Sequence, residues 1–186
     1  MKTVSELVSY FVGRLEGAGA DYLVVGAVAY FAYGTPRATK DLDLVIATDA
    51  ATLEGLLRDL PPELSLDPQA RMELFTATMR WVIDVRETEL KVGLFLLGDD
   101  PHHREEFVRR RRVAIAGAEV EAWIATAEDL VIQKLRWARR KDLDDARNIL
   151  AVQGEAIDYT HLELWCGRHE TLDRLAEVRA SIPPGL

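Results

Sequence analysis

Two aspartates separated by a single leucine form the part of the sequence with the clearest chemical potential. The stretch Asp41-Leu-Asp-Leu-Val-Ile46 begins with the two-residue period of a strand, so both carboxylates should leave the same face. Two adjacent carboxylates repel each other unless a proton, an arginine or a metal ion offsets their charge. Carboxylate oxygens suit Mg²⁺ or Mn²⁺, and Mg²⁺ usually completes its shell with water and substrate phosphates. We therefore predict a metal site at Asp41 and Asp43, with the polar edge of a solvent-facing strand as the alternative.

A glycine precedes the aspartate pair at a predicted strand-to-helix turn. Tyr22-Leu-Val-Val25 is typical of a short buried strand, and it runs through Gly26 into a stretch of alanines and aromatics that Gly34 ends. A glycine at the start of a helix leaves backbone N–H groups open to an anion. A triphosphate could therefore bridge this turn and a metal held by the aspartates, as phosphoryl transfer requires. The alternative is a glycine that only relieves a tight turn.

Lys134 lies on the apolar stripe of a predicted helix, together with Val131, Leu135 and Ala138. An ammonium group beside an apolar face needs an anionic partner, which makes Lys134 a candidate to line a cleft. The alternative is a lysine that extends along the helix into solvent.

The remaining basic residues and histidines carry weaker signals. His102 and His103 have no metal-ligand spacing with another histidine, so we expect both at the surface. The four arginines from Arg109 to Arg112 could guide RNA or phosphate, but a solvated charge run at a helix end is the preferred interpretation.

Periodicity and turn signals predict the elements that must position these residues. The segments 80–86 and 91–97 are joined by a short polar turn and are expected to form an antiparallel hairpin, as are 112–116 and 119–124. Residues 61–79 give no clear pattern. Further strands are predicted at 22–25 and 41–46, and helices at 4–15, 27–34, about 50–60, a short stretch after Pro101, 126–141, 142–153, 159–168 and 171–179.

Composition bounds the class of protein. The 186 residues can close one principal hydrophobic core, and 48% hydrophobic with 29% charged residues is typical of a globular fold. The net charge of −8 argues against non-specific coating of nucleic acid. A single cysteine, Cys166, excludes an intramolecular disulfide and favours a cytoplasmic protein. The longest apolar stretch, 22–34, is too short to span a membrane, so no membrane partner is expected.

Several motifs together resemble a known superfamily. Gly26 after a strand, Gly34, Arg37, Thr39 and the Asp41–Asp43 pair look like the first motif of the DNA polymerase beta nucleotidyltransferases. With Ala127-Glu-Asp-Leu130, Lys134-Leu-Arg-Trp-Ala138, Lys141-Asp142 and Asp145, the pattern is similar to bacterial abortive-infection nucleotidyltransferase toxins. The resemblance covers roughly residues 20–150.

The resemblance implies a fold, a reaction and a set of partners. The fold would be α+β, with a mixed sheet in a nucleotidyltransferase-like core at 1–125 and a helical part at 126–186 packed on it as one compact unit. The reaction would move a nucleoside monophosphate from an NTP to a hydroxyl group, with Mg²⁺ or Mn²⁺ as cofactor. The acceptor would be RNA or protein, and a cognate antitoxin or a second copy of the chain would be the binding partner. Asp41 and Asp43 would hold metal, and nucleotide would contact Gly26, Ala27, Arg37, Thr39, Lys134, Lys141 and Asp142.

The sequence departs from the superfamily pattern at two positions. Ala27 stands where a second small residue, glycine or serine, is usual. More important, Gly93 in Lys91-Val-Gly-Leu-Phe95 stands where a third catalytic carboxylate is expected, and Asp84 on the preceding strand is the candidate to replace it. Loss of a general base typically costs a factor of about 100 to 10,000 in rate. The sequence therefore leaves two main functions open, a nucleotidyltransferase with reduced or altered catalysis and a non-catalytic relative that binds NTP or a protein partner. A third possibility is an interaction module whose helical end pairs with another chain through its apolar faces.

Overall fold

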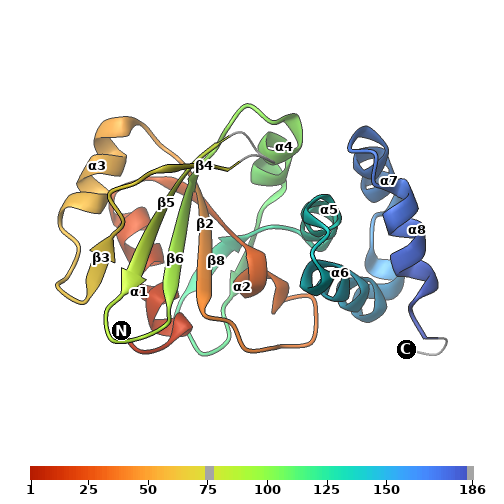
Figure 1. Ribbon diagram of the computed structural model, residues 1–186, viewed down its shortest axis with the longest axis horizontal. Coiled ribbons are helices and arrows are strands. Elements are labelled where there is room, and N and C mark those ends of the chain that lie inside the picture. Colours follow the sequence, from red (N-terminus) through yellow and green to blue (C-terminus); the bar gives the residue numbers. More distant parts are fainter. Residues whose placement is uncertain (74–77, 184–186) are drawn as a thin grey trace.

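A mixed eight-stranded sheet is the framework of the computed structural model, which describes residues 1–73 and 78–183 (Figure 1). The strands follow the order β3-β5-β6-β2-β1-β8-β7, and β4 pairs with β5 beside this path. β2 pairs in parallel with β6, and β1 pairs in parallel with β8, while the other pairs are antiparallel. The strands are β1 (Asp21–Val25), β2 (Asp41–Ala47), β3 (Leu64–Leu66), β4 (Arg71–Glu73), β5 (Thr78–Val85), β6 (Lys91–Leu96), β7 (Arg111–Ala114) and β8 (Glu121–Ile124).

The two hairpins expected from the sequence are confirmed, since β5 pairs with β6 and β7 pairs with β8, both antiparallel. β3 and β4 lie in the segment 61–79 without a clear pattern, and each is only three residues long, which is too short for alternation to identify a strand. Part of that segment, residues 74–77, lies outside the described residues.

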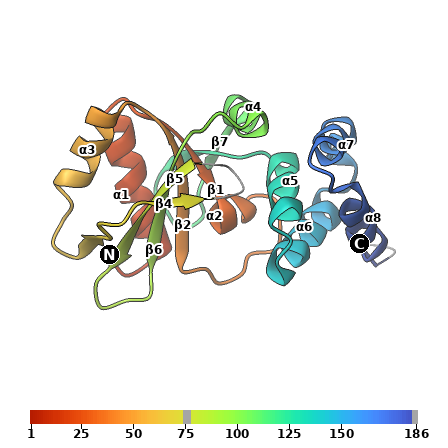
Figure 2. The ribbon, with the colours of Figure 1, turned by 45° about the horizontal axis from the view of Figure 1, so that its top comes forward.

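Helices cover the sheet and then gather at one end of the molecule (Figure 2). α1 packs against β1 and β2 through an apolar face that includes Leu7, Phe11 and Leu15. Thr126 caps the first helix of the C-terminal group by accepting the backbone N–H of Asp129. The helices are α1 (Val4–Gly17), α2 (Gly26–Tyr30), α3 (Ala50–Arg58), α4 (Pro101–Arg109), α5 (Ala127–Trp137), α6 (Arg140–Gln153), the 3₁₀ turn η1 (Gly154–Ala156), α7 (Tyr159–Arg168) and α8 (Leu172–Ala180).

Two helix ends differ from the sequence prediction. The helix expected from Thr126 to Lys141 is broken, because Ala138 adopts a left-handed conformation with φ 52° and its N–H donates to Lys134 O. The chain then restarts as α6, so Arg139 and Lys141 lie at a corner rather than on a continuous helix. The helix expected at 27–34 ends at Tyr30 and continues as turns up to Gly34.

One continuous apolar core holds the sheet and helices together. Leu44 and Leu23 from the central strands, Ile83 from β5 and Leu135 from α5 are all fully buried in it. Such burial is worth about 1.5–3 kcal/mol for each large side chain. Among the described residues, no helix combines the length and the apolar character needed to cross a lipid bilayer. The α+β fold with a mixed sheet and a C-terminal group of helices agrees with the sequence prediction.

Candidate functional site

The carboxylate of Asp43 lies between two glycines on neighbouring segments. β2 runs between β1 and β6, and Asp43 pairs with Val25 on one side and with Gly93 on the other. A Cβ atom at Gly26 would come within 2.7 Å of Asp43 Oδ2, and one at Gly93 within 2.6 Å of Oδ1. Gly26 also has φ +67°, which side chains rarely adopt. Both glycines therefore make room for this one carboxylate.

Burial sets the electrostatics of Asp43. The side chain is only 18% exposed, and burial raises its pKa to about 6, while the Arg80 guanidinium opposes the shift and the Asp41 carboxylate adds to it. Asp41 lies two residues away on the same strand face, and its backbone N–H donates to Thr39 Oγ1 over 3.3 Å. A buried carboxylate that resists ionisation in this way, with a second carboxylate on the same strand face, gains from a bound cation.

A cavity of about 330 Å³ lies between the aspartate pair and the helices α5 and α6. Phe95 and Leu130 contribute apolar surface to it, while Glu106 and Gln133 contribute polar side chains. The structure thus brings together residues that are more than 100 positions apart in the sequence. Every residue predicted to hold metal or nucleotide lines this cavity, namely Gly26, Ala27, Arg37, Thr39, Asp41, Asp43, Lys134, Lys141 and Asp142.

Lys134 and Arg37 share one acidic partner on the helical wall. Lys134 Nζ lies 2.6 Å from Asp145 Oδ2, and Arg37 binds the same carboxylate through Nε at 2.9 Å and Nη2 at 2.8 Å. Burial alone would raise the pKa of Asp145, but these hydrogen bonds hold it below its usual range. The prediction that Lys134 needs an anion is confirmed, and its side chain is buried rather than extended into solvent. Arg37 lines the same cavity as the aspartate pair, but its guanidinium binds Asp145 rather than Asp41 or Asp43.

Asp84 does not lie beside the aspartate pair. The register aligns Asp84 with Lys91 on β6 and Lys91 with Asp41 on β2, so Asp84 shares the face of the aspartates but is two strands away. Its carboxylate is half exposed, pairs with Lys91 Nζ over 3.1 Å and lines neither described cavity. The cationic side chain of Arg80 approaches Asp43 from β5 instead, with Nη2 at 3.8 Å from Oδ1.

Arg80, the first residue of the predicted strand 80–86, is a residue near Asp43 that the sequence motifs did not indicate. Its spacing from Asp84 places it on the same face, and this signal was available. A second cavity of about 260 Å³ shares the aspartate pair with the first and brings in Arg80. It is lined by Asp41, Asp43, Arg80, Phe95, Trp137, Arg139 and Lys141.

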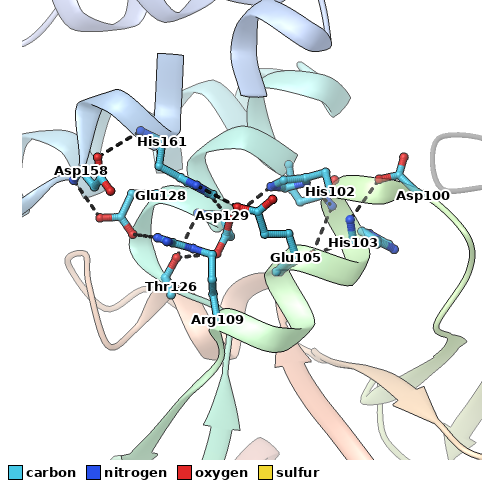
Figure 3. A network of polar contacts seen from close by, with 12 residues as sticks. Asp100, His102, His103, Glu105, Arg109, Thr126, Glu128, Asp129, Asp158 and His161 are labelled. Atoms are coloured by element: carbon cyan, nitrogen blue, oxygen red, sulfur yellow. Dashed lines mark hydrogen bonds and ion pairs between the residues drawn. The ribbon is translucent and has the colours of Figure 1, made fainter. Parts of the chain in front are cut away.

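His102, Asp129 and His161 form a buried histidine–aspartate cluster (Figure 3). None of the three residues lines either cavity. Asp129 Oδ1 accepts hydrogen bonds from Nε2 of His102 at 3.2 Å and from Nε2 of His161 at 2.8 Å. Asp129 Oδ2 accepts hydrogen bonds from Thr126 Oγ1 at 2.7 Å and from Arg109 Nε at 3.2 Å. Although burial would raise the pKa of Asp129, the hydrogen bonds from the two histidines keep it well below its usual range.

The histidine–aspartate cluster fastens α4, α5 and α7 to one another. Its three ligand-type atoms lie within 4.8 Å of each other, but both imidazoles point at one carboxylate oxygen and an arginine contacts the other. Hydrogen bonds therefore satisfy the group, and the nearby guanidinium opposes a cation. The prediction that His102 and His103 lie at the surface is wrong, because both are buried. The arginine run is also more than a solvated charge run, since Arg109 and Arg110 are tied into ion pairs.

Comparisons with known proteins agree with this fold. The structure is similar to an antigenic nucleotidyltransferase-like protein from Paracoccidioides brasiliensis, with 16% identity, a TM-score of 0.56 and coverage of 96% of this chain and 93% of that one. It is also similar to the antibiotic-resistance factor ANT(2'')-Ia, with 12% identity, a TM-score of 0.58 and coverage of 93% and 96%. At these identities the likeness shows the fold alone. A search of the curated proteins finds no match.

The sequence itself matches a family model over most of its length. Residues 4–171 match the family described as "Nucleotidyl transferase of unknown function (DUF2204)". The match includes the aspartate strand, both flanking glycines and the helices that carry Lys134 and Asp145. The chain therefore belongs to this nucleotidyl transferase family.

Proposed function

We propose that this protein transfers a nucleoside monophosphate from an NTP to a hydroxyl group of an acceptor. A divalent ion, either Mg²⁺ or Mn²⁺, is held by Asp41 and Asp43. The observation that carries the proposal is the placement of both aspartates at the border of a cavity that also contains Gly26, Lys134 and Lys141. Membership of a nucleotidyl transferase family supports the same reaction class.

The donor atoms at the aspartate pair fit a divalent cation. Only carboxylate oxygens are offered, which suits the hard ions Mg²⁺ and Mn²⁺. Gly26 and Gly93 keep the space around both oxygens of Asp43 free of side chains. When bound, the ion would neutralise phosphate charge and polarise the reacting phosphoryl group.

The residues around the aspartates divide into binding and supporting roles. Lys141 is exposed, lines both cavities and is placed to attract the phosphates of the NTP. Asp142 is buried and binds the guanidinium of Arg139, which keeps Arg139 at the rim of both cavities. Lys134 is held by Asp145, so its role in this proposal is to fix the helical wall of the nucleotide cavity.

Nucleotide binding without transfer is the second candidate function, and Gly93 is the observation that favours it. The register places Gly93 directly beside Asp43, and no other residue of β5 or β6 brings a carboxylate next to the aspartate pair. A missing general base lowers the rate by a factor of about 100 to 10,000. The proposed transfer is therefore slow. If its rate falls to zero, the protein only binds nucleotide.

One protein with a similar fold shows nucleotide attached to a small acceptor molecule. A crystal structure of ANT(2'')-Ia contains adenylyl-2''-tobramycin, in which a nucleotide is attached to a small molecule. For this chain, an RNA or protein acceptor and a cognate antitoxin remain predictions of the closer resemblance to abortive-infection toxins.

Calorimetric titration of each NTP with Mg²⁺, beside a labelled-nucleotide transfer screen, tests the proposal. The wild type should bind at least one NTP, and the double variant Asp41→Asn/Asp43→Asn should bind it at least tenfold more weakly. Asp84→Asn serves as the control, because that carboxylate lies outside both cavities. Equal binding by the double variant and the wild type would refute the metal role of the pair.

A further inference from the structure

We propose that Arg80 takes the place of a second metal ion, so that the aspartate pair works with one divalent cation and one fixed guanidinium group. This inference rests on the proposed function, because it assumes that Asp41 and Asp43 hold a cation. It also assigns a role to Gly93, which stands where the superfamily pattern has a third carboxylate.

Strand register brings Arg80 to the correct face of the sheet. Asp43, Gly93 and Val82 form one row across β2, β6 and β5. Arg80 lies two residues from Val82, so its side chain leaves the same face in the next row, opposite Phe95. From there the guanidinium crosses diagonally over Gly93 to reach Asp43 Oδ1, where Nη2 stops at 3.8 Å.

Glycine at position 93 is what permits this crossing. A Cβ atom there would lie 3.1 Å from Arg80 Nη2 and 2.6 Å from Asp43 Oδ1. A side chain at this position would therefore force the Asp43 carboxylate and the Arg80 guanidinium out of their present positions. The absence of an acid at 93 and the presence of the guanidinium beside Asp43 are thus one feature of the site rather than two.

The Arg80 side chain packs against an aromatic ring but stays partly exposed to solvent. It lies over the Phe95 ring, with Cζ 5.0 Å from the ring centroid. Arg80 Nε is buried and has no hydrogen-bond partner among the described residues, while the side chain as a whole is 37% exposed. Arg80 lines the second cavity together with the aspartate pair. A negatively charged group that enters this cavity would meet Arg80 and Asp43 together.

The arrangement discourages a second cation beside Arg80. Among the described residues that line the second cavity, Asp41 and Asp43 alone offer carboxylates, and a divalent ion held there would be repelled by the guanidinium. In the transfer step the acceptor oxygen bonds to the α-phosphorus, the bond from that phosphorus to the bridging oxygen breaks, and pyrophosphate leaves with its electrons. The acceptor proton passes to solvent, and Arg80 supplies positive charge next to the phosphoryl group.

Counting bound ions tests the proposal independently of activity. Mn²⁺ is titrated into the wild type with an α,β-methylene NTP analogue, and the unbound ion is measured by its electron paramagnetic resonance signal. The wild type should bind one Mn²⁺ that Asp43→Asn removes. Arg80→Gln should bind the same single ion roughly tenfold more tightly because a repelling charge is gone, and Arg80→Lys should behave as the wild type.

The double variant Arg80→Gln/Gly93→Asp should bind two ions, since it exchanges the guanidinium for a third carboxylate. Two Asp43-dependent ions in the wild type, or an unchanged Mn²⁺ affinity in Arg80→Gln, would overturn the role of Arg80 and leave the proposed function intact. Mn²⁺ binding that Asp43→Asn does not alter would instead overturn the proposed function itself.

Discussion

Replacing Asp43 by asparagine should stabilise the fold in the absence of metal, although it should abolish the proposed function. Burial raises the pKa of Asp43 from 3.8 to about 6, so folding above pH 6 must maintain a charge that the site disfavours. One pKa unit corresponds to about 1.4 kcal/mol, which gives an upper limit of about 3 kcal/mol. The side chain keeps 18% exposure, and the variant loses a weak attraction to Arg80. We therefore expect a gain of about 1–2 kcal/mol in the free energy of unfolding.

The sign of the pH dependence follows from the direction of the pKa shift. Below pH 3.8 Asp43 is protonated in both the folded and the unfolded states, so it imposes no penalty. The penalty grows as the pH rises from 3.8 to 6, because the unfolded state releases its proton first, and it is constant above that range. The advantage of the asparagine variant should accordingly be largest above pH 6 and shrink towards pH 4.

Thermal unfolding of wild type and Asp43→Asn, in EDTA at pH 7.5 and pH 4.5, measures this difference. For a chain of this size the expected gain raises the melting temperature by about 2–8 °C at pH 7.5. The order should reverse with Mg²⁺ and NTP in excess, because only the wild type gains binding energy. Asp84→Asn is the control and should change stability by less than about 0.5 kcal/mol. A metal-free Asp43→Asn protein that melts below the wild type at pH 7.5 would refute the reasoning.

Three further perturbations follow from the contacts. Asp145→Asn should lower the free energy of unfolding by about 2–4 kcal/mol in urea titrations because it leaves the buried Lys134 without its anion; a loss below about 1 kcal/mol would contradict this. Gly26→Ala should weaken NTP binding at least tenfold, as read by calorimetry, since its Cβ would meet Asp43. Gly19→Ala has a similar φ of +64° but open space around it, so it should keep wild-type affinity, and equal losses in both variants would argue for general strain. Dialysis of the double variant Asp41→Asn/Asp43→Asn against EDTA should leave its melting temperature unchanged, because hydrogen bonds satisfy the histidine–aspartate cluster, whereas a fall of more than about 3 °C would reveal a structural ion in that cluster.

Local pattern was enough to place the aspartate strand and the elements next to it. The alternation in residues 41–46 predicted that both carboxylates lie on one face of a strand, and the apolar spacing from Val4 onward predicted α1. The sequence also indicated that Lys134 needs an anion, because its helix face is otherwise apolar. These features depend on neighbours within a few residues, and such neighbours are fixed by the period of a helix or a strand.

Only the tertiary structure decided which charges meet. Arg37 and Asp145 are 108 residues apart, and nothing in the local sequence of either residue shows that Asp145, rather than the aspartate pair, receives the guanidinium. His102 was placed at the surface for the same reason, since its partner Asp129 lies on another helix.

The approach of Arg80 to Asp43 required strand order and register, because period alone assigns a residue to a face without naming the strands beside it. The amino-acid sequence by itself determined the acidic pair, the flanking glycines and the family resemblance. Only the folded sheet shows that the Arg80 guanidinium occupies the space beside Asp43, because a side chain from β5 reaches that carboxylate across Gly93 on β6.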